Sequence, residues 1–184
     1  MYTQQSSSNV QKATIGGGCF WCLDAVYRKV KGIIEIESGF CGGIEANPSY
    51  ELACSGQTGH IEVVDIRFDS TIISYQALLS IFFAAHDPTQ TNGQGYDIGP
   101  QYRSVIFYHD EEQQQIAKQM MAELNDSAVF DQPIATLLRP AMPFYAAPAE
   151  HQDFYNQRTT VPYCQIIIQP KLNKIAKLFA AQLL

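Results

Sequence analysis

The sequence predicts a single domain of the α+β or α/β class. Strand-like and helix-like segments alternate along the 184 residues, which is typical of elements that share one core. Hydrophobic residues make up 46% of the chain and charged residues 16%, a composition of globular rather than disordered proteins. This length suits one domain with a substantial core. We therefore expect one catalytic domain over residues 12–184, after a disordered lead-in over residues 1–11.

The first half of the chain contains three strand patterns and two helix patterns. A strand over residues 13–15 precedes a helix that has one apolar face. That face consists of Leu23, Val26, Tyr27 and Val30. Residues 33–40 and 60–68 are expected to be strands. Ser74 is expected to cap a further helix that ends at residues 86–88.

The second half continues the alternation and ends in a helix. Two long loops, over residues 41–59 and 89–101, are rich in glycine and polar residues, and loops of this length are often functional. Further expected elements are strands over 103–108, 134–138 and 163–169, helices over 110–126, 150–157 and 171–184, and a proline-rich connection over 139–148.

Charge and cysteine content exclude several classes of protein. The net charge of −6 argues against binding to nucleic acid or to an anionic membrane surface. No apolar run approaches the ~20 residues of a membrane span, and the first eleven residues lack the regions of a secretory signal. Five irregularly spaced cysteines fit catalytic or redox use better than a disulfide framework. A cytoplasmic location is expected.

Residues 16–22, Gly-Gly-Gly-Cys-Phe-Trp-Cys, place a cysteine where a strand turns into a helix. Unpaired N–H groups at a helix start carry partial positive charge, so they favour a thiolate. Cys19 is therefore the candidate nucleophile, whereas a lone cysteine is more often a core residue. Phe20 and Trp21 are oddly placed for core packing, and we interpret them as the wall of a pocket.

Cys19 and Cys22 form a C-x-x-C pair, which leaves three chemistries open. A zinc site would need a second closely spaced pair, which this sequence lacks, so no metal and no cofactor are expected. A thioredoxin-like dithiol exchanger would use the same placement, but two large aromatic residues between the cysteines are unusual for it. The third chemistry is attack by Cys19 alone, with a resolving thiol elsewhere and a substrate methyl held by the aromatic wall.

Glu62 lies on the more apolar face of the strand over residues 60–68. Val64, Ile66 and Phe68 form the rest of that face. A carboxyl group there would be desolvated, which raises its pKa and makes it a candidate proton donor at neutral pH. The alternative is that Glu62 sits at a frayed, solvated strand end.

Six sequence blocks resemble those of the peptide methionine sulfoxide reductase A family, in the family's order. They lie within residues 13–158, nearly the whole domain, and such an ordered set is specific. The blocks are Gly18–Trp21, Asn47–Tyr50, Cys54–Gly59, Gly59–Val64, Gln101–Ile106 and His151–Tyr155. The resemblance implies an α+β fold with a ferredoxin-like βαβ core and long active-site loops. It also implies reduction of the S epimer of methionine sulfoxide, free or in proteins.

The resemblance also implies roles for individual residues. Cys19 matches the nucleophile that becomes a sulfenic acid, and Glu62 matches the carboxyl that protonates the sulfoxide oxygen. Phe20 and Trp21 match the wall around the substrate methyl. The remaining matches are hydroxyls that bind the oxygen or a water (Tyr50, Tyr102), an acidic residue that shapes the site (Asp97) and a structural support (His151).

The sulfenic acid must then react with a second thiol. Cys164 is favoured because the family's resolving cysteines often lie in a C-terminal segment, while Cys22 and Cys41 stay candidates. Cys54 is interpreted as structural or spare. Cys22 stands where the family often has glycine, which is a departure from the pattern. The resemblance implies thioredoxin as the reductant of the last disulfide. We expect a monomer.

Overall fold

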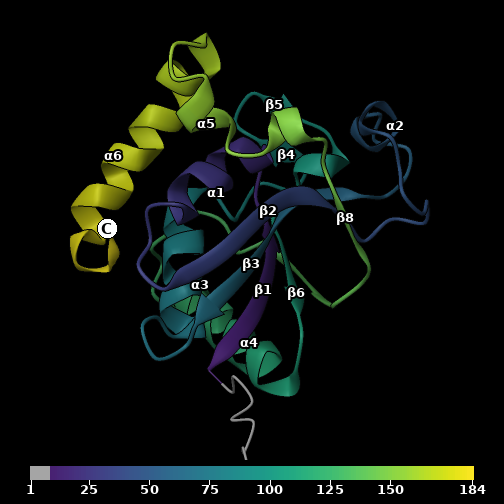
Figure 1. Cartoon of the computed structure of the whole chain (residues 1–184). Helices are drawn as coiled ribbons and strands as arrows, with labels where there is room; N and C mark the ends of the chain where they lie inside the picture. Colours follow the sequence, from purple (N-terminus) through teal and green to yellow (C-terminus); the bar gives the residue numbers. More distant parts are fainter. Residues whose placement is uncertain (1–8) are drawn as a thin grey trace, which may run out of the picture.

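A six-stranded mixed sheet in the order β7-β6-β1-β3-β2-β8 forms the centre of the computed structural model, which describes residues 9–184 (Figure 1). Its strands are β1 (Val10–Gly16), β2 (Ile33–Cys41), β3 (Ile61–Asp69), β6 (Val105–Tyr108), β7 (Leu137–Pro140) and β8 (Phe144–Ala146). β7 pairs with β6 in parallel, and the other neighbours are antiparallel. The order β6-β1-β3-β2, with a helix after β1 and another after β3, is the ferredoxin-like βαββαβ arrangement. The expected α+β fold is confirmed.

Two helices, α1 and α3, pack against one face of this sheet. The α-helices are α1 (Phe20–Tyr27), α2 (Tyr50–Cys54), α3 (Tyr75–Ala85), α4 (Glu111–Asp126), α5 (Phe154–Gln157) and α6 (Gln169–Leu178). On β3, the side chains of Val64, Ile66 and Phe68 are fully buried in the main core with α1 and α3, as their alternation predicts. A smaller apolar cluster, which includes Cys41 and Val63, lies on the opposite face.

The cap expected at Ser74 is present. Ser74 Oγ accepts a hydrogen bond from the Ala77 N–H at 3.0 Å. Ser74→Ala should lower the free energy of unfolding by about 1 kcal/mol, because this N–H loses its side-chain partner. Urea denaturation measures the loss. Ser80→Ala, within the same helix, is the control and should cost less than about 0.5 kcal/mol. Equal losses in the two variants would contradict the capping role.

Some expected boundaries were wrong. Val10 and Gln11, placed in the lead-in, belong to β1, and residues 1–8 of that lead-in lie outside the described residues. β7 begins at Leu137 rather than at residue 134, because its pairing with β6 starts there. The proline-rich connection contains β8, which adds to β2 at the sheet edge. Proline disfavours central strands but is tolerated at an edge.

The extended structure expected over residues 163–169 was also wrong. Residues Cys164–Ile168 form a π-helical turn that leads into α6, and the helix ends at Leu178 rather than at residue 184. The isoleucine-rich run favours a strand intrinsically, but its buried positions follow a helical spacing at Cys164, Ile168, Leu172 and Ile175. Burial therefore overrides propensity. Pro170 lacks an N–H and would clash with the preceding turn of a regular helix, so the wider π turn accommodates it.

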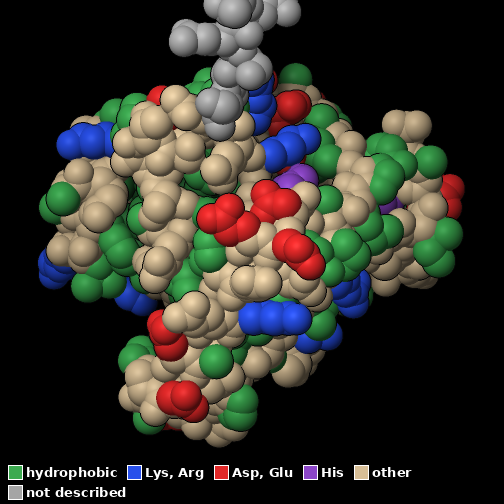
Figure 2. Space-filling model, turned by 90° about the horizontal axis from the view of Figure 1, so that it is seen from below, with side chains coloured by type: hydrophobic (Ala, Val, Ile, Leu, Met, Phe, Trp, Pro, Cys, Tyr) green, Lys and Arg blue, Asp and Glu red, His purple; other side chains and the backbone are tan. Residues whose placement is uncertain are grey.

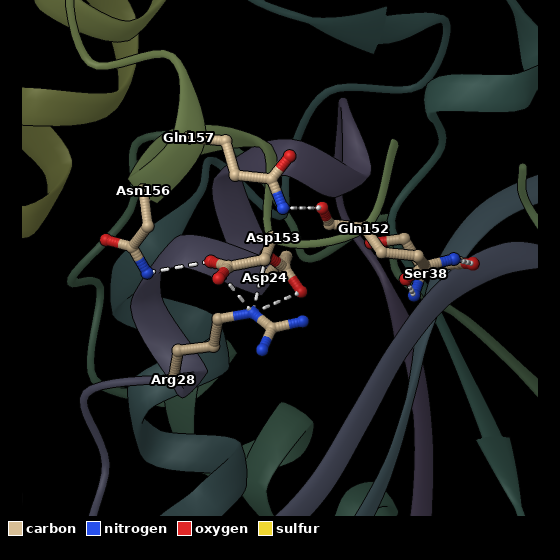
Figure 3. Close-up of polar contacts among 7 residues, drawn as sticks. All are labelled: Asp24, Arg28, Ser38, Gln152, Asp153, Asn156 and Gln157. Carbon is tan, nitrogen blue, oxygen red and sulfur yellow. Dashed lines mark hydrogen bonds and ion pairs between the residues drawn. The ribbon is translucent and has the colours of Figure 1, made fainter. Parts of the chain in front are cut away.

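Polar contacts fix the start of the C-terminal segment, residues 147–184, to the sheet and to α1 (Figure 3). The Gln152 side chain exchanges two 2.8 Å hydrogen bonds with the backbone of Ser38 on β2. Arg28 Nε lies 3.0 Å from Asp24 and 3.3 Å from Asp153. Burial raises the pKa of Asp24 to about 6, although Arg28 opposes the shift. A carboxyl group inside α1 thus helps to hold the chain that crosses it.

The far end of the same segment is fixed to the turn between α1 and β2. Lys31 N donates to Gln182 O at 2.7 Å, and Leu184 N donates to Lys29 O at 2.8 Å. A β-bridge joins Val30 and Leu183 between them. Residues 147–184 are therefore held at both ends.

Figure 2 views the end of the molecule at which β1 begins, and there acidic and basic side chains are interspersed among hydrophobic ones. Within residues 9–184, no helix combines the length and apolar character that crossing a membrane requires.

Candidate active site

The glycine-rich turn after β1 brings the starts of α1 and β3 together. A side chain at Gly16 would place a Cβ atom 2.5 Å from the backbone oxygen of Glu62, so only glycine permits this approach. Gly18 has a φ of +85°, a conformation that other residues rarely adopt. Its N–H donates to the backbone oxygen of Tyr102 at 3.1 Å. Cys19 follows directly and is the N-cap of α1, at the strand-to-helix turn that the sequence predicts.

Cys19 is buried, with 8% of its surface exposed. Burial is the main cause that raises the pKa of its thiol well above the usual value, and the charges of Glu62 and Cys22 add to it. The Trp21 N–H at the helix start has the opposite, smaller effect. The expectation that the helix start gives a thiolate is therefore wrong for the resting state, because desolvation outweighs the helix terminus.

Glu62 lies beside Cys19 and is 2% exposed. Its Oε1 accepts a hydrogen bond from the Phe20 N–H at 3.0 Å, so the first turn of α1 orients the carboxyl. Burial raises the pKa of Glu62 to about 8, with the Asp97 charge contributing and the Phe20 and Cys19 hydrogen bonds opposing. The frayed-end alternative is excluded, and at neutral pH the carboxyl keeps its proton.

Two tyrosines and Asp97, which come from the two long loops, lie near Cys19 and Glu62. Tyr50 begins α2, and Tyr102 ends a 3-10 turn over Pro100–Tyr102. Burial raises the pKa of both hydroxyls, and Glu62 and Cys19 add to both shifts, so these phenols stay protonated donors beside the pair. Asp97, in the short strand β5 (Asp97–Ile98) that pairs with β4 (Gly93–Gln94), lines the same site as Cys19.

An aromatic stack surrounds Trp21, two residues after Cys19. Trp21 stacks on Phe154 with ring centroids 3.7 Å apart. His151 lies parallel to Trp21 at 5.8 Å and to Tyr50 at 4.0 Å. Phe20 is almost fully buried, 1% exposed. Two side chains of the C-terminal segment, His151 and Phe154, thus pack against Trp21, while Phe20 belongs to the main core.

A cavity of about 260 Å³ opens beside the nucleophile candidate. Cys19, Cys22, Asp97, Tyr163 and Lys171 line it. Tyr163 Oη lies 3.4 Å from Cys22 Sγ and donates to Asp97 Oδ2 at 2.7 Å. Tyr163 and Lys171 are not assigned to the site from sequence, because their patterns predict a strand and an amphipathic helix.

The three other cysteines lie in different surroundings. Cys41 is fully buried in the cluster on the opposite face of the sheet, and its Sγ donates to Met142 O at 3.5 Å. Cys164 is fully buried in the main core on the π-helical turn. Cys54 is half-buried beside Tyr50. All five thiols are free. Within residues 9–184, no three histidine, cysteine or acidic side chains are grouped to hold a metal ion.

Comparisons with known proteins agree on one family. The family model for peptide methionine sulfoxide reductase matches residues 11–183. A relative named peptide methionine sulfoxide reductase MsrA, from Saccharolobus solfataricus, is 50% identical over 170 residues, which is 92% of this chain and 95% of the relative. The crystal structure of reduced Mxr1 from Saccharomyces cerevisiae has a TM-score of 0.80 at 29% identity, covering 86% of this chain and 91% of Mxr1. Mxr1 in complex with Trx2 matches with a TM-score of 0.58 at 22% identity, covering 81% and 87%.

Proposed function

Because the chain belongs to the peptide methionine sulfoxide reductase family, we propose that its Cys19 and Glu62 reduce the S epimer of methionine sulfoxide to methionine. The enzyme is a thiol-dependent oxidoreductase of methionine sulfoxide. One observation carries the residue assignment: a buried carboxyl with a pKa of about 8 is oriented by the helix that begins at the buried thiol.

The proposed reaction starts with both groups protonated. Glu62 donates its proton to the sulfoxide oxygen, which makes the substrate sulfur strongly electrophilic. The positive charge that develops there favours loss of the Cys19 proton, which returns to the Glu62 carboxylate as Sγ attacks. Methionine leaves, and the oxygen remains on Cys19 as a sulfenic acid. Two electrons pass from the cysteine to the substrate sulfur, and no net proton is consumed.

The surrounding residues are proposed to position the substrate. Phe20 and Trp21 hold its methyl group by apolar contact. The hydroxyls of Tyr50 and Tyr102 donate hydrogen bonds to the sulfoxide oxygen or to a water on it, and Asp97 shapes the cavity beside them. The apolar contacts then fix the methyl group, the acid and the hydroxyls fix the oxygen, and Cys19 attacks the sulfur from a third direction, which gives a physical basis for selecting one epimer.

Recycling is proposed to use a second cysteine and then thioredoxin. The basis is likeness: yeast Mxr1, to which this chain is similar, has been crystallised with Trx2. A thioredoxin thiolate would attack the disulfide and take up the oxidising equivalents. The five free thiols suit a reducing compartment, so we propose a cytoplasmic monomer that acts on free methionine S-sulfoxide or oxidised proteins.

The test is a single-turnover reaction with the separated S and R epimers of a blocked methionine sulfoxide, without external reductant. The S epimer should yield about one methionine per enzyme, and the R epimer none. Equal yields from both epimers would contradict the stereochemical proposal. Disulfide exchange without methionine from either epimer would support the dithiol exchanger instead.

The pKa of Glu62 predicts how the sulfoxide step depends on pH. The acid form is the active one, so the single-turnover rate should be constant below pH of about 8. Above it the rate should fall about tenfold per pH unit as the carboxyl ionises. Rapid-quench measurements between pH of about 6 and 10 check this. A rate that rises through this range would show that ionisation of Cys19 limits the step instead.

A further inference from the structure

Cys22 and Tyr163 form a directed hydrogen-bond chain beside Cys19. Tyr163 Oη donates its only hydrogen to Asp97 Oδ2 at 2.7 Å, so its lone pairs are left for the S–H of Cys22 at 3.4 Å. The Tyr163 ring is held edge-on to Trp21 at 5.7 Å, which fixes the direction of the hydroxyl. A thiol, a phenol and a carboxylate are thus connected in the order in which a proton could move.

The geometry points to Tyr163 and Asp97 as a proton path that activates Cys22 as the resolving thiol. This inference rests on the proposed function, because it concerns the sulfenic acid that sulfoxide reduction leaves on Cys19. It revises the expectation that Cys164 resolves. Among the described residues that line the cavity, Cys19 and Cys22 are the two cysteines.

As Cys22 Sγ attacks Cys19 Sγ, its proton moves to Tyr163 Oη, and the phenolic proton moves to Asp97. Asp97, which lines the same cavity as Cys19, gives a proton to the sulfenic oxygen. The S–O bond breaks, water leaves, and a disulfide joins the two cysteines. Tyr163 receives the Cys22 proton as it gives up its own, and Asp97 passes on the proton that it receives. Both groups therefore end the step in their starting protonation states.

The charges around Cys22 explain why such a path is needed. Burial raises the pKa of Cys22, and the negative charges of Asp97 and Glu62 add to this effect. Lys171 and the Tyr163 hydrogen bond oppose it. The titratable and charged groups that face Cys22 are Cys19, Glu62, Asp97, Tyr163 and Lys171. Glu62 is protonated again after the sulfoxide step, so transfer of the proton to Asp97 neutralises the remaining opposing carboxylate while the thiolate forms.

The position of Cys22 on α1 suits a bond to Cys19. Cys22 N donates to Cys19 O at 3.1 Å within the first turn. Residues three apart on a helix have Cβ atoms about 5–6 Å apart, and a disulfide requires about 3.5–4.5 Å. A small adjustment of this turn is therefore sufficient. By contrast, Cys41 lies on the opposite face of the sheet, and neither Cys41 nor Cys164 is among the residues that line the cavity beside Cys19.

The test measures sulfenic acid and disulfide separately in wild type, Tyr163→Phe and Asp97→Asn. The enzyme is oxidised without reductant, once with the sulfoxide and once with one equivalent of hydrogen peroxide, which converts a cysteine thiol to sulfenic acid and water. Dimedone trapping and mass spectrometry follow the two forms over time. Both variants should accumulate sulfenic acid on Cys19, with Cys19–Cys22 disulfide formation slowed about 10²-fold.

The pH profile separates a proton path from a merely structural role. Without the path, the Cys22 proton must go to solvent, so disulfide formation in Tyr163→Phe should become about tenfold faster per pH unit. Wild type should vary little between pH of about 6 and 8. The matched control is Tyr155→Phe, which removes a hydroxyl that bonds to Gln169 within the same C-terminal segment. It should keep the wild-type rate and slope.

Two results would overturn the inference. One is a first disulfide between Cys19 and Cys164. The other is a Tyr163→Phe profile that matches the Tyr155→Phe control. Absence of methionine, with normal resolution of the peroxide-generated sulfenic acid, would instead reject the proposed function and leave the proton path supported.

Discussion

Cys19→Ser is expected to abolish methionine formation, with a loss of about 10⁴-fold or more in single turnover. The reason is electronic as well as kinetic. Reduction of a sulfoxide needs two electrons, and the cysteine sulfur supplies them when it becomes a sulfenic acid. A serine oxygen cannot accept a second oxygen in this way. Rapid quench with separation of free methionine measures the loss.

The control for this experiment is Cys41→Ser, which makes the same change at a buried thiol on the opposite face of the sheet. It should form methionine at the wild-type rate. Cys19→Ser should still bind the sulfoxide, which isothermal titration detects. Methionine formation by Cys19→Ser above the rate without enzyme would remove Cys19 from the mechanism.

Glu62→Gln should slow the sulfoxide step by about 10²- to 10⁴-fold, the usual contribution of a general acid. The glutamine oxygen can still accept the 3.0 Å hydrogen bond from the Phe20 N–H, so the start of α1 keeps its partner. The amide can donate a hydrogen bond to the sulfoxide oxygen but cannot transfer a proton. The fall in rate above pH of about 8 should also disappear, because the group that titrates there is gone.

Glu35→Gln is the matched control for this prediction. It makes the same substitution at a half-exposed ion pair with Arg67 on the sheet surface, where the effect on stability is small. Its sulfoxide step and pH profile should equal those of wild type. A Glu62→Gln variant that keeps both the rate and the fall above pH of about 8 would contradict the assignment of Glu62 as the acid.

Local patterns predicted the parts of the fold whose burial is regular. The alternation on β3 and the helical spacing on α1 placed their core faces correctly. β8 was missed because edge pairing tolerates a proline-rich sequence that carries no strand pattern. The π-helical turn at Cys164–Ile168 was missed because β-branched residues favour strands, while burial against the main core decides their conformation.

For the site, too, sequence could predict only the residues that stand out in their local pattern. Cys19 and Glu62 could be singled out because each breaks a local rule, a cysteine after three glycines and a carboxyl on an apolar face. Tyr163 and Phe154 carry no such local signal, since only the path of the C-terminal chain across α1 brings them to the site. The ionisation state of the thiol was mistaken because it depends on burial that neighbouring sequence does not reveal.

The double attachment of the C-terminal segment has a kinetic consequence. Contacts with β2 and α1 hold this chain before residue 163, and contacts with the α1–β2 turn hold it after residue 178. Closing the loop between these two attachments therefore costs conformational entropy only once, when the protein folds. Tyr163 is presented to Cys22 at a high and constant effective concentration in every cycle. A thiol on a free tail would have to search for its target each time, whereas here the second step begins from groups already in contact.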